Sequence, residues 1–168
     1  MVPASHRRAR AALSFGTTLV AILLPGMGVA DPKPEGHVGV ATPFVTVGEE
    51  ATTIADQFTL LVPIGVGLKL NDSVVVDFET VVATPIKPGG MNGLVVDPGV
   101  VVNTGPVAVG LRVAFQLNQR GNVGLIPLVN RGLVDFGGGV WFIEAAFPTF
   151  FDSNGVTFNA VLHTGVGF

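Results

Sequence analysis

The chain has 168 residues, no cysteine, 12% charged residues and a formal net charge of −3. The lack of cysteine excludes disulfides, thiolate metal sites and cysteine nucleophiles, and the acidic balance argues against a nucleic-acid-binding surface. Hydrophobic residues make up 48% of the chain, yet Gly, Pro, Asn and Asp interrupt every apolar run after residue 30. None of these runs reaches the roughly 18 residues that a transmembrane helix needs.

Residues 1–30 follow the order of regions in a secretory signal peptide. Three arginines in residues 1–10 precede the apolar run AALSFGTTLVAILL, and small residues end the segment at Ala30. We predict cleavage after Ala30, which leaves residues 31–168 as a single domain with six basic and twelve acidic residues. An uncleaved N-terminal anchor is the alternative, although the apolar run is short for a bilayer span.

The rest of the chain alternates large apolar residues with small or polar ones, and this period of two predicts β-strands. Clusters of Asn, Asp, Ser, Gly and Pro between the runs are typical of turns. The predicted strands are eight in number and span residues 37–47, 57–70, 73–82, 94–103, 106–117, 122–130, 133–148 and 156–168.

The residues opposite the large apolar rows are mostly Gly, Ala and Thr, with a few single charges. Small residues suit a crowded interior better than a solvated surface, whereas rows of Val, Leu and Phe suit hydrocarbon. Because an open sheet edge finds no hydrogen-bond partner in lipid, such a sheet must close. We therefore predict an all-β fold, an eight-stranded antiparallel up-and-down transmembrane β-barrel.

Prolines inside the predicted strands favour another interpretation, a soluble periplasmic or secreted β-barrel or β-sandwich that binds an apolar ligand. These are Pro43, Pro63, Pro98 and Pro127. Each implies a bulge or a missing ladder bond, because proline has no N–H. Tyrosine is absent and Trp141 is the single tryptophan, so the aromatic girdles of a membrane barrel would consist mainly of Phe.

The last predicted strand, VTFNAVLHTGVGF, carries an apolar row that ends on an aromatic residue and that only Thr164 interrupts. Together with the signal peptide and the eight strands, it resembles the small eight-stranded outer-membrane β-barrel proteins of bacteria. The resemblance implies a C-terminal insertion signal made of Phe158, Leu162, Val166 and Phe168. It also implies a monomer in the outer membrane, with a structural or interaction role or at most a narrow channel. The implied partners are outer-membrane lipid, periplasmic chaperones and the barrel-insertion machinery, and no nucleic acid.

Polar residues on the small-residue face predict a structural network in the barrel lumen. Its predicted members are Asp77, Glu79, Asp97, Arg112, Gln116, Asn159 and His163. A tight turn at Thr104-Gly105 would set Asp97 directly opposite Arg112, where unlike charges attract. Glu79 would then lie near Asp97, and acid–base chemistry by these two carboxyl groups is the alternative to a structural ion network.

We predict no catalytic residue, no cofactor and no metal site. Some outer-membrane barrels are lipid-modifying enzymes, but His163 has no neighbouring nucleophile, because Ser73 and Ser153 fall in predicted turns. His37 and His163 lie on the first and last strands, yet no third ligand for a metal accompanies them.

The strand predicted at residues 133–148 has two possible phases. Unbroken alternation from an inward Asp135 turns Glu144 toward lipid or into the headgroup zone. A bulge at Gly137-Gly138-Gly139 brings Glu144 inside and Trp141 outside instead. We favour the bulge.

Overall fold

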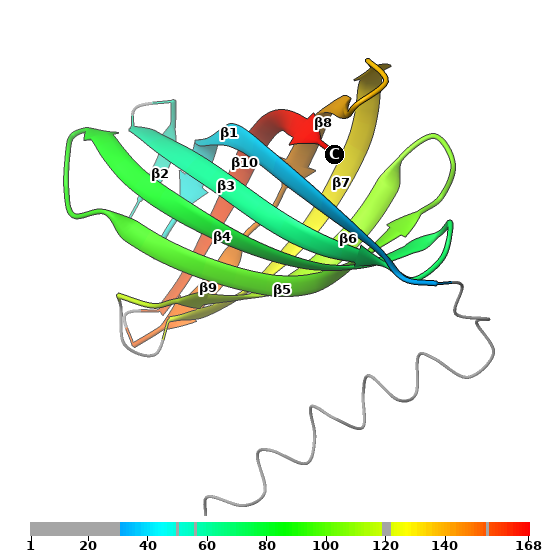
Figure 1. Ribbon diagram of the computed structural model, residues 1–168. Coiled ribbons are helices and arrows are strands. Elements are labelled where there is room, and N and C mark those ends of the chain that lie inside the picture. Colours follow the sequence, from blue (N-terminus) through cyan, green and yellow to red (C-terminus); the bar gives the residue numbers. More distant parts are fainter. Residues whose placement is uncertain (1–30, 50, 56, 119–121, 154) are drawn as a thin grey trace, which may run out of the picture.

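The computed structural model describes residues 31–168 except residues 50, 56, 119–121 and 154 (Figure 1). The predicted signal peptide, residues 1–30, lies outside the described residues. Within the described part, no helix is long and apolar enough to cross a membrane.

The described chain folds into one antiparallel sheet that closes on itself, because β1 pairs with β10 along most of its length. The strands are β1 Lys33–Val47, β2 Thr52–Ile54, β3 Phe58–Lys69, β4 Val74–Lys87, β5 Gly93–Asn103, β6 Ala108–Gln116, β7 Val123–Asp135, β8 Val140–Ala146, β9 Thr149–Asp152 and β10 Gly155–Gly167. Two of the barrel's strands are interrupted: β2 and β3 both pair with β1, and β8 and β9 both pair with β7 and β10. The result is an eight-stranded antiparallel closed barrel, which confirms the predicted architecture and excludes a sandwich.

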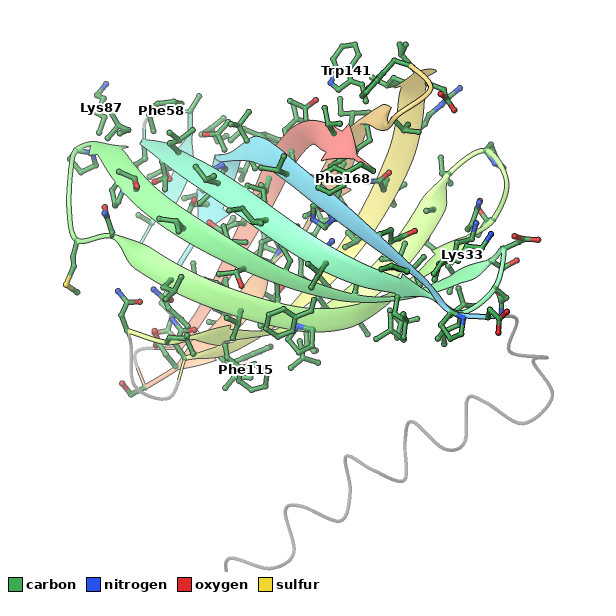
Figure 2. All side chains as sticks on the ribbon, viewed as in Figure 1. Lys33, Phe58, Lys87, Phe115, Trp141 and Phe168 are labelled. Atoms are coloured by element: carbon green, nitrogen blue, oxygen red, sulfur yellow. The ribbon has the colours of Figure 1, made fainter. Side chains whose placement is uncertain are left out.

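Alternate residues of each strand face opposite sides of the barrel wall, as the period of two requires. In β7, Leu125 and Val129 are exposed, whereas Ile126 and Leu128 between them are buried. The outer wall therefore carries large apolar side chains. Among them are Val38, Val40, Ile64, Val66, Val76, Phe78, Val100, Val102, Val109, Leu111, Val113, Phe115, Leu125, Val129, Trp141, Ile143 and Leu162, and we call them the apolar outer surface. Figure 2 shows Phe58, Phe115 and Trp141 projecting away from the barrel.

The two ends of the barrel differ in their connections. At one end, where β1 begins and β10 ends, short turns at residues 70–73, 104–107 and 136–139 join the strands. We call this the terminal end. The opposite end, which we call the loop end, holds the connections from β1 to β3, from β4 to β5 and from β6 to β7.

The predicted break between the strands 122–130 and 133–148 is wrong, and so is the predicted strand 133–148. Strand β7 continues to Asp135, and the chain reverses at residues 136–139 before β8. The Asp135 carboxylate accepts a hydrogen bond from the Gly137 N–H at 2.8 Å, and Gly137 adopts a φ of 80° that favours glycine. The predicted bulge at the three glycines is therefore a turn. Its expected consequence is nevertheless confirmed, because Glu144 is 4% exposed and Trp141 is 46% exposed.

The strand prolines fit into the closed barrel in different ways. At Pro43 the register with β10 shifts before Val45, which is the expected irregularity. Pro63 pairs with Val81 and Pro127 with Leu111 without any shift. There the wall keeps its register, and the missing N–H costs no more than a local ladder bond.

Candidate functional site in the barrel lumen

Arg112, which projects inward from β6, is the centre of a buried ionic cluster. Its Nη2 lies 2.7 Å from Asp77 Oδ2, and its Nε donates to the same oxygen at 2.8 Å. Its Nη1 lies 3.4 Å from Glu79 Oε1 and 3.3 Å from Glu144 Oε1. The guanidinium thus bridges carboxyl groups of β4 and β8 across the barrel, and each of these side chains is almost completely buried.

Two histidines extend the cluster toward the seam between β1 and β10. His37 Nε2 lies 2.6 Å from Glu79 Oε2, and His163 Nδ1 lies 3.4 Å from Glu144 Oε1. The two imidazole centroids are 6.1 Å apart, and the Phe142 ring meets both rings edge-on. We call the whole set the charged layer: His37, Asp77, Glu79, Asp97, Arg112, Glu144 and His163.

Glycines on neighbouring strands make room for the long side chains of the charged layer. A Cβ built at Gly99 would stand 2.5 Å from Arg112 Cγ and from the Leu111 carbonyl oxygen. A Cβ at Gly65 would overlap the His37 ring, and one at Gly39 would overlap the His163 ring. Glycines on the inward face therefore leave the room that the long charged side chains occupy. This gives a physical reason for the many small residues on that face.

The charged layer divides the lumen into two cavities. The cavity at the terminal end has a volume of about 840 Å³, and the cavity at the loop end has a volume of about 390 Å³. Arg112 and Glu144 line both cavities. Since an eight-stranded barrel is just wide enough for side chains to fill it, the ion pair between these residues is the partition between the two spaces.

The predicted network falls into two separate groups. Asp77, Glu79, Asp97, Arg112 and His163 belong to the charged layer. Gln116 and Asn159 lie nearer the loop end, where the Gln116 side chain accepts from Asn122 Nδ2 at 2.9 Å and Thr46 Oγ1 donates to Asn159 Oδ1 at 2.8 Å.

The predicted pairing of Asp97 with Arg112 is wrong by two residues, since Arg112 pairs with Gly99 and Asn103 with Ala108. The turn is longer than expected, because the Thr104 N–H donates to the Val107 carbonyl at 2.9 Å. A shift of two preserves the face of a strand, so Asp97 Oδ1 still lies 3.9 Å from Arg112 Nε. The predicted proximity of Glu79 and Asp97 is confirmed, since the two residues are direct partners in the ladder.

Three members of the site were not among its predicted residues: His37, Asn130 and Glu144. Asn130 Nδ2 donates to Glu144 Oε2 at 3.2 Å, so the last residue of the predicted strand 122–130 is a lumen residue. Asn130 reaches the lumen through the register shift between Gly132 and Val134, because a plain hairpin from the pair Asp135 and Val140 would set residue 131 opposite Glu144.

Two buried polar atoms of the charged layer have no hydrogen-bond partner among the described residues: Asp97 Oδ1 and His163 Nε2. The described residues also contain no group of three or more His, Cys, Asp or Glu side chains arranged to hold a metal ion.

Of the residues named as the insertion signal, Phe158, Leu162 and Val166 belong to β10, and Phe168 follows the strand and lies at the cavity of the terminal end. Leu162 and Phe168 are exposed, and the Phe158 ring stacks on Phe147 with centroids 6.4 Å apart. Thr164, the polar residue in this row, accepts a hydrogen bond from Trp141 Nε1 and donates one to the Phe142 carbonyl, both at 2.8 Å. Its hydroxyl is therefore satisfied within the barrel wall.

Comparison with protein families, with curated proteins and with solved structures finds no match for this chain.

Proposed function

We propose that this chain is a bacterial outer-membrane β-barrel protein with a structural or interaction role, whose lumen allows at most a narrow conducting path. The observation that carries the proposal is the inverted distribution of polarity across the wall. Ile64 and Val66 on β3 are 55% and 62% exposed, whereas Asp77 and Glu79 on the neighbouring strand are each 4% exposed.

The size of the apolar outer surface supports a lipid environment. Contiguous apolar patches on soluble monomers rarely exceed a few hundred Å², whereas here exposed Val, Leu, Ile and Phe side chains occur on all the long strands. Water would have to hydrate this entire band, while hydrocarbon accommodates it without cost. A closed barrel also leaves no strand edge unpaired in lipid.

The charged layer supports a closed or narrow lumen. Arg112 makes ion pairs to β4 and β8, and the residues that bridge the lumen are almost fully buried. An ion or solute moving from one cavity to the other would have to separate these pairs. A wide water-filled pore is therefore not the function we propose.

Outer-membrane lipid would contact the apolar outer surface, and the outer row of β10 would be the segment that the barrel-insertion machinery and periplasmic chaperones bind. This part of the proposal rests on the resemblance of Phe158, Leu162, Val166 and Phe168 to the terminal strands of small outer-membrane barrels. The protein would act as a monomer.

The test is to express the full-length chain in a bacterium with two membranes, separate the fractions, and run the membrane fraction on SDS gels with and without boiling. We expect recovery in the outer membrane and a mobility shift that boiling abolishes, because a closed barrel resists SDS. Reconstituted protein should show no conductance or only small conductance steps in planar bilayers. Recovery as a soluble periplasmic protein without a mobility shift would contradict the proposal and favour a soluble barrel that holds an apolar ligand.

A further inference from the structure

The cavity at the loop end has the size and lining of a small-molecule site. Its volume of about 390 Å³ falls in the range of ligand pockets. Its lining mixes apolar and polar residues, and the apolar ones include Leu61, Val95, Ile126, Phe150 and Val161. Carboxyl groups of the charged layer lie at its inner end. Apolar surface next to converging polar groups is a common feature of binding pockets.

The inner end of this cavity has an excess of acidic groups. Glu79, Asp97 and Glu144 face it, and Arg112 is the only Lys or Arg side chain among the described residues that line it. Among the described lining residues, the cavity at the terminal end has five carboxyl groups and three basic side chains, Lys69, Arg112 and Arg131, whereas the cavity at the loop end has four carboxyl groups and Arg112. Carboxyl groups therefore outnumber basic side chains by three at the loop end and by two at the terminal end.

Asp97 has a buried carboxyl oxygen that receives no hydrogen bond from the described residues. Its side chain is 1% exposed, and Oδ1 has no hydrogen-bond partner among the described residues. Arg112 directs its Nε to Asp77, which leaves Asp97 Oδ1 at 3.9 Å, beyond hydrogen-bonding distance. A buried carboxyl group without a donor is costly, and a donor that enters from the cavity would remove that cost.

We propose that the cavity at the loop end binds a small organic cation, with its ammonium group donating to Asp97 and Glu79 and its apolar body against Leu61, Val95 and Ile126. A bare metal ion is a poorer fit, because it needs several converging oxygen or nitrogen ligands and the described residues offer no such group. An anion would be repelled by the same carboxyl groups. The site is in the lumen, so the proposal goes beyond the outer-membrane role and does not depend on it.

The experiment is calorimetric titration of the refolded full barrel in detergent with phenethylammonium, and with 2-phenylethanol and 3-phenylpropanoate as matched neutral and anionic probes. We expect saturable binding of the ammonium with a Kd below about 1 mM, as ligands of this size can reach. Binding of both comparison probes should be at least tenfold weaker. Equal binding of the ammonium and the alcohol would overturn the proposal.

Two isosteric variants locate the site. Asp97→Asn should weaken phenethylammonium binding at least tenfold, whereas Asp72→Asn, a carboxyl change on the exposed turn that borders the cavity at the terminal end, should leave it unchanged. A far-UV circular dichroism spectrum like that of the wild type shows that each variant still folds. Equal affinity in the wild type and Asp97→Asn would contradict the assignment.

A second measurement covers the case in which Asp97→Asn does not fold. Because the native chain has no cysteine, Gln116→Cys and Ser73→Cys place single thiols in the cavities at the loop end and the terminal end respectively. Phenethylammonium should slow labelling of the thiol at position 116 by a methanethiosulfonate reagent and leave the thiol at position 73 unaffected. Equal protection at both positions, or at neither, would overturn the proposed location. These readouts use refolded protein, so their failure is distinct from a failure to fractionate with the outer membrane.

Discussion

The outer face and the lumen of this barrel are built from the same strands, yet they follow opposite chemical rules. On β6, Arg112 is 3% exposed and touches three carboxyl groups, while the next residue, Val113, is 38% exposed and faces outward. A shift of one residue along a strand therefore moves a side chain from an ionic cluster to an apolar surface. In this chain, the side of the strand on which a residue lies determines the environment of its side chain. The overall residue composition matters less.

The largest expected effect comes from removing the positive charge of the lumen. Arg112→Met should destabilise the folded barrel by about 3–5 kcal/mol, because it leaves several buried carboxyl groups without their cation. Equilibrium unfolding in urea, with the protein in lipid vesicles, measures the loss. The matched control is Lys69→Met, whose pair with the fully exposed Asp72 at 3.6 Å should contribute little, because water screens it. Similar losses in the two variants would contradict a lumen held together by Arg112.

A positive charge added at Val113, the residue after Arg112, should also destabilise the barrel if the outer face meets lipid. Val113→Arg should cost about 2–4 kcal/mol in vesicles, as arginine does near the middle of a bilayer. Met91→Arg is the control, because Met91 is 76% exposed in the connection between β4 and β5 and should tolerate the charge. For a barrel in water, Val113→Arg should change the unfolding free energy by no more than about 0.5 kcal/mol. That result would contradict an outer face in contact with lipid.

A smaller effect should follow from filling the space beneath Arg112. Gly99→Ala should cost about 1–3 kcal/mol through overpacking, because the new methyl group meets the Arg112 side chain and the Leu111 backbone. Gly138→Ala, where the added Cβ has no neighbour within 4 Å, should be close to neutral. Urea unfolding of both variants checks the difference, and a neutral Gly99→Ala would show that Arg112 is free to shift.

The smallest expected effect is at the polar rim of the lumen. Thr46→Val should cost about 0.5–1.5 kcal/mol, because it removes the hydrogen bond from Thr46 Oγ1 to Asn159. Thr52→Val, at an exposed position on β2, should stay within about 0.5 kcal/mol of the wild type. Identical stabilities for the two variants would mean that this bond contributes nothing to the lumen.

The difference between the two faces also explains which features could be predicted from the sequence. Alternation repeats over every strand, so the eight-stranded closed architecture and most inward charges follow from it. Turn positions depend on two or three residues each. The side chains of Asn103 and Asp135 each accept a hydrogen bond from the N–H of a glycine two residues later, at 2.9 Å and 2.8 Å. Asp135-Phe136-Gly137 lies within an apolar stretch, however, so this turn is hard to recognise in the sequence.

The contacts that fix the register of a hairpin form only in three dimensions. The bond from Thr104 to the Val107 carbonyl lengthens the turn and moves Arg112 opposite Gly99. Nothing in the alternation distinguishes this register from one displaced by two residues, because both keep the same face inward. The ionic contacts of Glu144 and His37 likewise depend on closure of the sheet, which brings β1, β8 and β10 together.

The most direct test of the account uses three consecutive residues of the same type, Val100, Val101 and Val102 on β5. Each is replaced by a single cysteine in the cysteine-free chain, labelled with a nitroxide in lipid vesicles, and examined for relaxation by oxygen and by a water-soluble nickel chelate. We expect high oxygen and low nickel accessibility at positions 100 and 102, and the reverse preference at position 101, which lines the cavity at the terminal end. Strong nickel accessibility at positions 100 and 102 would place the apolar outer surface in water and contradict the account.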